Sequence, residues 1–269
     1  LLAPALASAV LALAGLEAVI AIDLVTCGAA VGSVLFLIRF PEGGGPRERV
    51  PVLRSAWEGV QWLRRNRGIL DIILFLAAIN LIASVYNAAL APMVLSRPGG
   101  GEAALGVLQT FTGAANLAGS VAATLLPAPK SRVRVICGSL LFSMGTENLL
   151  LALGRGPGIW CLGAVLGWLF IPVMSANLEA LLRLHIPVEL QGRVYAARNT
   201  LQFFTIPVGY LLGGWLVDAV CEPFMAGLAA DAFLTRLLGS GKGSGAALVF
   251  LILSAAGVLV CLLFQRDRR

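Results

Sequence analysis

One acidic side chain of this sequence lies well inside an apolar run. Glu147 falls within 133–153, a segment of mostly apolar residues. A carboxyl group in hydrocarbon is costly, so such groups usually face a bundle interior or a water-filled cavity and mark ion pathways. We predict that Glu147 responds to protons or another coupling ion; a hydrogen bond or ion pair to a neighbouring helix is the alternative. Glu179 precedes Arg183 by four residues, which predicts a local ion pair.

Amide side chains recur on single faces of the apolar segments. Asn80 and Asn87 are seven residues apart, and Gln109 and Asn116 also share one helical face. Such amides either line a pathway for an amphipathic ligand or hydrogen-bond one helix to another, which contributes ~0.6 kcal/mol each. Both interpretations stay open. The candidate substrate-cavity residues are Asn80, Asn87, Gln109, Asn116, Asn177 and Gln202.

The sequence lacks the motifs of common catalytic, metal and nucleotide sites. It has one histidine and five cysteines without a C-x-x-C pair. There is no G-x-S-x-G or H-E-x-x-H motif, and GSGKGSG lacks the spacing of a phosphate-binding loop. We therefore predict no enzyme, no metal and no cofactor.

The composition is that of a membrane protein. Of the 269 residues, 58% are hydrophobic and 13% are charged, and the mean hydropathy is +0.89; a soluble domain has about 25% charged residues. The net charge of +6 is typical of nucleic-acid binding too, but the basic residues fall in short clusters between apolar runs. That pattern is typical of membrane loops, so the predicted partner is the lipid bilayer and not nucleic acid.

Seven apolar segments are long enough to cross a bilayer, for which a helix needs about 20 residues. An eighth segment, at the start of the sequence, is clipped. The predicted spans are 1–14, 19–38, 69–95, 103–126, 133–153, 158–182, 194–220 and 246–264. Their length and lack of charge favour helices over barrel strands. We predict an all-α polytopic membrane helix bundle of about eight spans.

The basic residues fall on alternate connections between these spans. Sixteen of the 20 lie in 39–68, 127–134, 183–198 and the C-terminus. The other four are Arg97, Arg155, Arg236 and Lys242. Because positive charge is retained in the cytoplasm, we predict a multi-pass protein of the cell (inner or plasma) membrane with a cytoplasmic C-terminus.

The basic connection 39–68 contains an amphipathic pattern. The apolar residues that recur at helical spacing are Leu53, Ala56, Trp57, Val60 and Leu63. They predict a short helix over 52–65 lying on the inner membrane surface; packing against other loops is the alternative.

Glycine and proline mark the later spans. Small-xxx-small pairs, which let helices approach closely, are Gly163/Gly167 and Gly209/Gly213. Pro172 and Pro207 lie in mid-span, where each removes a backbone hydrogen bond. Bent or broken helices are common where transporters move.

Four stretches are similar to parts of one transporter family. They are GLEAVIAIDLVT (15–26), VPVLRSAWEGVQWLRRNRGIL (50–70), VELQGRVYAARN (188–199) and IPVGYLLGGWLVDAVCEPFM (206–225). Together they resemble the major facilitator superfamily, in its multidrug and macrolide-type efflux branch. The most specific part is the Gln191-Gly192-Arg193 turn combined with Asp218 and Glu222-Pro223.

The resemblance implies a fragment of a partial major-facilitator fold without the first four helices. Residues 1–38 would be the last two helices of the N-terminal half, 39–68 a cytoplasmic linker and 69–269 the C-terminal six-helix half. It implies efflux of small amphipathic compounds by alternating access, driven by protons or another ion, with Gln191, Gly192 and Arg193 at the cytoplasmic gate. The missing helices would be a partner, so we expect no export by the isolated chain.

Two other functions stay open. One is a non-transporting membrane interaction or regulatory protein derived from a transporter, for which changing Asn80, Asn116 or Glu147 would not affect export. The other is a lipid flippase of the same fold, which needs a laterally open groove.

Overall fold

The computed structural model describes residues 17–18, 20–37, 52–229 and 231–267, and all regular elements in these ranges are helices. The all-α prediction is therefore confirmed for this part of the chain. The chain divides into two compact units, residues 1–50 and 51–269. In the first unit an apolar helix covers Ile20–Phe36, and the π-helical segment η1 (Ser33–Leu37) overlaps its end. The predicted span 1–14 lies outside the described residues.

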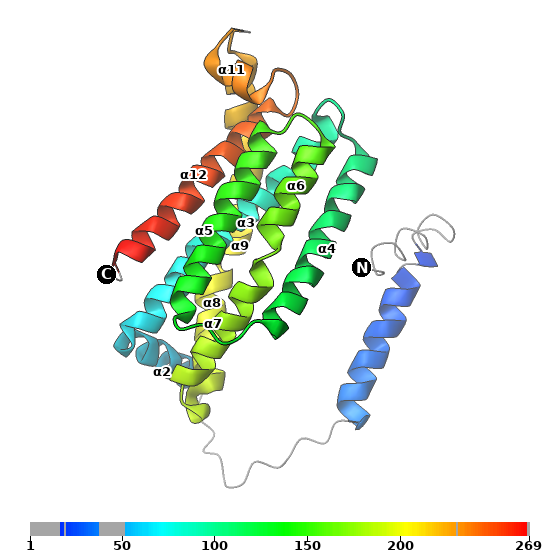
Figure 1. The fold of residues 1–269 in the computed structure, drawn as a ribbon. Helices are drawn as coiled ribbons and strands as arrows, with labels where there is room; N and C mark the ends of the chain where they lie inside the picture. Colours follow the sequence, from blue (N-terminus) through cyan, green and yellow to red (C-terminus); the bar gives the residue numbers. More distant parts are fainter. Residues whose placement is uncertain (1–16, 19, 38–51, 230, 268–269) are drawn as a thin grey trace. The chain divides into compact units, whose positions relative to one another are not determined.

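The second unit is a bundle of helices that run up and down between two ends (Figure 1). Its elements are α2 (Val52–Arg65), α3 (Arg67–Ser96), α4 (Glu102–Leu125), α5 (Arg132–Leu153), α6 (Pro157–Trp168), α7 (Ile171–His185), η2 (Val188–Leu190), α8 (Gln191–Phe203), α9 (Thr205–Trp215), η3 (Leu216–Cys221), α10 (Glu222–Ala226), α11 (Phe233–Leu238) and α12 (Ser244–Asp267).

Five helical stretches among the described residues are long and apolar enough to cross a membrane. They are Arg67–Ser96, Arg132–Leu153, Pro157–His185, Val188–Ala226 and Ser244–Arg266. Each corresponds to a predicted span, which supports a membrane-embedded protein. Helix α4 covers the predicted span 103–126 but is less apolar and is not among the five. The count of eight spans therefore stays a prediction.

Helices α3 and α5 form the centre of the bundle. Helix α3 packs against α9, α12 and α8, while α5 packs against α12, α6 and α7. Fully buried side chains such as Ile73 of α3, Leu140 of α5 and Phe250 of α12 belong to the core of the bundle. Helix α4 buries only Leu108, Ala115 and Gly119. Its exposed large side chains are Val107, Phe111, Leu117, Val121 and Leu125, an apolar surface that suits contact with lipid.

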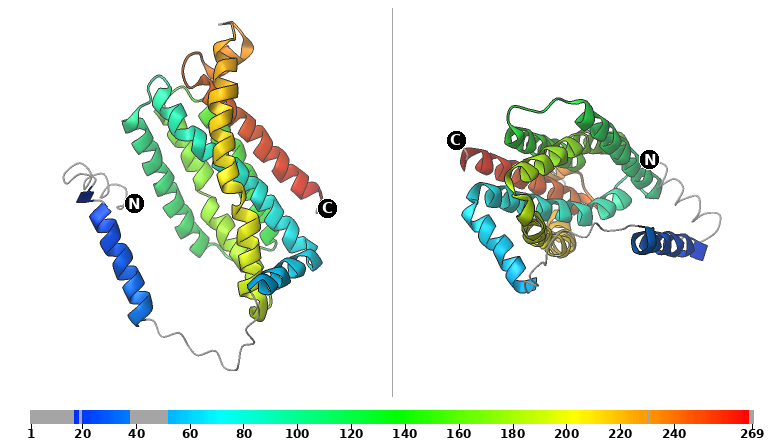
Figure 2. Two further views of the ribbon diagram at one scale, coloured as in Figure 1. Left: turned by 180° about the vertical axis from the view of Figure 1, so that it is seen from behind. Right: turned by 90° about the horizontal axis from the view of Figure 1, so that it is seen from below.

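The connections of the bundle lie at two opposite ends (Figures 1 and 2). At one end, here called the α11 end, lie the α3–α4 and α5–α6 connections, α11 and the start of α12. The other end has α2, the α4–α5 and α7–α8 connections and the end of α12. The predicted outer residues Arg97, Arg155, Arg236 and Lys242 all belong to segments of the α11 end. The basic residues are thus separated by end, while the membrane side of each end stays a prediction.

Two predicted spans are each divided into two helices. Helix α6 ends at Trp168 and α7 begins at Ile171, with Pro172 in its first turn. Likewise α8 ends at Phe203, and Pro207 lies in the first turn of α9. Proline is tolerated at a helix start, where its missing N–H has no intrahelical partner. The two prolines therefore mark the points at which these spans are interrupted.

Candidate functional site

The carboxyl group of Glu147 is buried between three helices. Its side chain is 3% exposed and projects from α5. Tyr86 of α3 donates its hydroxyl hydrogen to Glu147 Oε1 at 2.6 Å, and Trp168 of α6 donates its indole N–H to the same oxygen at 3.1 Å. The Tyr86 ring is held edge-on against Phe250 of α12, with ring centroids 5.4 Å apart.

A glycine makes room for this carboxyl group. A Cβ on Gly167 of α6 would lie 2.0 Å from Glu147 Oε2 and 2.6 Å from Glu147 Cβ. One turn earlier, a Cβ on Gly163 would lie 3.0 Å from Leu150 Cβ. The predicted close approach at Gly163/Gly167 is therefore confirmed, and its partner is the helix that carries Glu147.

The described polar partners of Glu147 are uncharged. Ser143 and Asn148 are buried on the same helix, and Ser143 Oγ and Asn148 Oδ1 accept no hydrogen bond from any described residue. Both partners of Glu147 within the described chain are neutral donors, and no ion pair is formed there. A bare carboxylate without a cationic partner is costly in such a place. Neutralisation by a proton or a cation is the chemistry that this site offers.

Two of the predicted cavity amides, Asn80 and Asn177, form side-chain contacts between helices, while the Gln202 side chain bonds within its own helix. Asn80 of α3 donates to the backbone oxygen of Gln202 on α8 at 3.2 Å, and Gln202 Oε1 accepts from Arg198 Nε at 3.1 Å. Asn177 of α7 accepts from Arg132 Nη1 at 3.3 Å. These contacts agree with the alternative in which the amides hydrogen-bond helix to helix.

The other three amides lie elsewhere on the bundle. Asn87 is exposed and donates to the Ala83 carbonyl of its own helix at 2.9 Å. Gln109 is exposed and Asn116 is half-buried, both on α4. Of the six predicted cavity residues, the described hydrogen bonds join only Asn80 and Gln202.

The predicted Glu179–Arg183 ion pair is wrong. Glu179 Oε1 instead accepts from Arg198 Nη1 of α8 at 2.7 Å, and Tyr195 donates its hydroxyl to Glu179 Oε2 at 3.1 Å. Arg198 is buried, whereas Arg183 is exposed. A buried charge needs a nearby opposite charge, while water can solvate an exposed one, so the acid pairs with Arg198. The pair joins α7 to α8 instead of one turn of α7.

Comparison of the chain with protein-family profiles, curated protein sequences and solved structures found no match. The resemblance to the major facilitator superfamily therefore stays a prediction, and the function has to be argued from the residues themselves.

The Gln191-Gly192-Arg193 turn is the first turn of α8, and it contacts α2. Gln191 Nε2 donates to the Ile186 carbonyl at 3.3 Å, while Arg193 forms an ion pair with Glu58 of α2. A Cβ on Gly59 would lie 2.4 Å from the Arg193 carbonyl oxygen, so the two backbones are close. Helix α2 has the predicted bounds 52–65. It packs against α8 and α3, which supports the alternative in which this helix contacts other parts of the protein.

We expect the Glu58–Arg193 pair to couple α2 to α8 weakly. Both side chains are partly exposed, at 31% and 37%, so the coupling free energy should be about 0.2–1 kcal/mol. Glu58→Gln, Arg193→Gln and the double variant, compared by chemical unfolding in detergent, would measure it as a double-mutant cycle. Strictly additive effects of the two substitutions would contradict the pairing.

Proposed function

We propose that this chain is the membrane-embedded part of an ion-coupled transporter that exports small amphipathic compounds by alternating access. The observation that carries this proposal is Glu147, a carboxyl group buried among neutral donors at the junction of α3, α5 and α6. Intramembrane carboxyl groups of this kind commonly serve proton or ion coupling. The membrane orientation proposed here has the α2 end and the C-terminus in the cytoplasm, as the basic residues indicate.

The protonation of Glu147 would change the contacts between these helices. An ionised carboxyl group only accepts hydrogen bonds, whereas a protonated one also donates one. Tyr86 and Trp168 both donate to Oε1, so a proton on Oε2 would leave these two bonds in place but make their acceptor neutral and the bonds weaker. If these helices have two alternative packings, binding of the coupling ion would shift the equilibrium between the two.

The interrupted helices support a moving bundle. The breaks before Ile171 and before Thr205 divide two apolar stretches near their middle. Discontinuous helices are common near the substrate and ion sites of secondary transporters. Trp168, which contacts Glu147, lies at the end of α6 directly before one of these breaks.

A non-transporting membrane protein is the second candidate. It is favoured by Asn80 and Asn177, which hydrogen-bond to neighbouring elements. In that case Glu147 would serve to hold three helices together, and ligand binding would not depend on its charge.

Proton-linked ligand binding separates these two functions. The chain in nanodiscs is titrated with ethidium, an amphipathic cation, and proton exchange is measured in weakly buffered solution. We expect binding that depends on pH in the wild type and in Glu189→Gln, which changes an exposed glutamate of η2. We expect Glu147→Gln to abolish that pH dependence. Equal, pH-independent behaviour of all three proteins would contradict the proposed coupling.

A further inference from the structure

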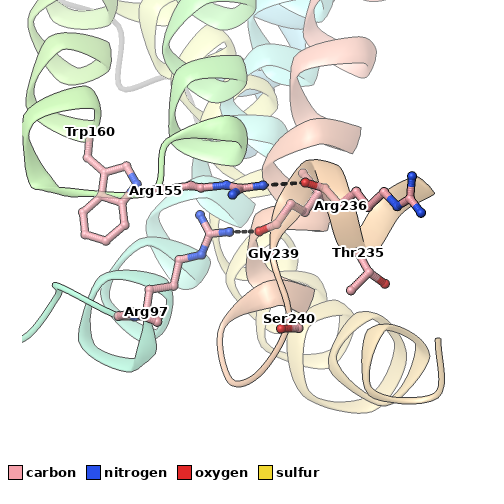
Figure 3. A pocket seen from close by; sticks show the side chains of 9 residues that line it. Arg97, Arg155, Trp160, Thr235, Arg236, Gly239 and Ser240 are labelled. Carbon is pink, nitrogen blue, oxygen red and sulfur yellow. Dashed lines mark hydrogen bonds between the residues drawn. The ribbon is translucent and has the colours of Figure 1, made fainter. Parts of the chain in front are cut away.

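A pocket of about 530 Å³ opens at the α11 end of the bundle. It is bordered by the end of α3, the α5–α6 connection and α11 (Figure 3). The polar and aromatic residues that line it are Arg97, Arg155, Trp160, Thr235, Arg236 and Ser240. Three of the four basic residues predicted for this side of the membrane therefore line one pocket.

Arg97 is a buried cation held by neutral groups. It is 8% exposed, and Nη1 donates to the carbonyls of Ala152 and Gly154 while Nη2 donates to that of Leu238. Three of the five N–H groups of a guanidinium are thus engaged, which leaves two. The carbonyls fix the position of Arg97 without neutralising its charge.

Arg155 brings a second cation to the same pocket. Arg155 is exposed, and one of its five guanidinium N–H groups donates to the Arg236 carbonyl at 2.5 Å. Four N–H groups are left for a ligand. Figure 3 shows the Arg97 and Arg155 side chains both reaching toward the backbone of α11, while the Arg236 side chain extends away from them. Burial, followed by repulsion from Arg155, lowers the pKa of Arg97. Two like charges are therefore held close together.

The acid that attracts Arg97 offsets only part of the charge of the two arginines. Glu222 is the carboxylate concerned, and its two oxygens accept the backbone N–H groups of Gly243 and Gly245 at 2.8 Å each. Neither Arg97 nor Arg155 forms an ion pair with a described residue. The pocket therefore retains an excess of positive charge.

Thr235 also borders the pocket, but its hydroxyl does not face it. The residue is 8% exposed, and Oγ1 is inaccessible to solvent and makes no hydrogen bond with any described residue. Figure 3 shows its side chain directed away from the Arg97 and Arg155 guanidinium groups. The ligand-binding donors of this pocket are therefore the two arginines.

We propose that this pocket binds a phosphate group, either of a small molecule or of a lipid headgroup. A tetrahedral phosphate accepts hydrogen bonds from several directions, as two guanidinium groups on different elements require. A single planar carboxylate would satisfy one guanidinium fork. The proposal does not depend on the transport function.

Binding of defined probes to the full chain in nanodiscs tests the proposal. In one arm inorganic phosphate is titrated at fixed ionic strength into phosphatidylcholine discs; in the other, thermal stability is compared between discs with and without phosphatidic acid. We expect saturable binding or stabilisation in at least one arm, and the responding arm identifies the source of the phosphate. Arg155→Gln should weaken that response about tenfold or more, since it removes charged donors.

Two further variants make the test specific. Thr235→Val keeps the shape of a side chain whose hydroxyl does not face the pocket, and it should leave binding nearly unchanged. Lys242→Gln removes an exposed positive charge from the same end, outside the pocket lining, and should change binding less than about twofold. Absence of a response in both arms, or equal binding by Arg155→Gln and wild type, would overturn the proposal.

Discussion

Replacing Gly167 with alanine is expected to force α6 away from α5 and to displace the Glu147 carboxyl group. The added Cβ would lie 2.0 Å from Glu147 Oε2 and 2.6 Å from Glu147 Cβ. Rotation of the carboxyl group relieves the first contact but not the second, so the backbones have to separate. Overpacking together with weakened hydrogen bonds from Tyr86 and Trp168 should lower the free energy of unfolding by about 2–4 kcal/mol.

The same helix offers a matched control. A Cβ on Gly158 would meet nothing within 4 Å, so Gly158→Ala should be neutral or stabilise by up to about 1 kcal/mol. Chemical unfolding in detergent micelles measures both variants, and indole fluorescence reports on Trp168. Equal stability of the two variants would show that α5 and α6 do not approach each other at Gly167.

Much of the fold could be predicted because the bilayer imposes simple rules on length and polarity. A helix buried on most sides needs a long apolar stretch, and α5 at Arg132–Leu153 differs little from the predicted 133–153. The bounds of α2 could be predicted at 52–65 because apolar residues recur there at helical spacing. The span predicted at 103–126 is a helix, α4, but small and polar residues lower its hydropathy and it is not among the five apolar stretches.

The partners of the polar side chains could not be predicted, since they depend on which helices become neighbours. Arg198 is 19 residues from Glu179, and Trp168 is 21 residues from Glu147. No local pattern connects residues so far apart. The indole of Trp168, directly after the small-xxx-small pair Gly163/Gly167, was the available signal that α6 approaches a polar group. In the same way, the sequence placed Arg97 and Arg155 on one side but did not indicate a shared pocket.

The contact between α3 and α9 is also expected to be sensitive to an added methyl group. A Cβ on Gly213 would lie 2.6 Å from Ala88 Cβ and 3.1 Å from the Val85 backbone. One turn earlier, a Cβ on Gly209 would lie 2.5 Å from Ser84 Cβ. Each Gly→Ala substitution should cost about 1–3 kcal/mol of unfolding free energy, because backbone and Cβ atoms cannot rotate away.

The neighbouring Gly214 provides the control, since a Cβ there would meet nothing within 4 Å. Gly214→Ala should be neutral or slightly stabilising in the same unfolding experiment. We expect the Gly209→Ala/Gly213→Ala double variant to lose less stability than the sum of the two single variants. Once the first methyl group has moved α9 outward, the second finds space already open. Fully additive losses would mean that each glycine meets α3 independently, and that α9 can bend between them at no cost.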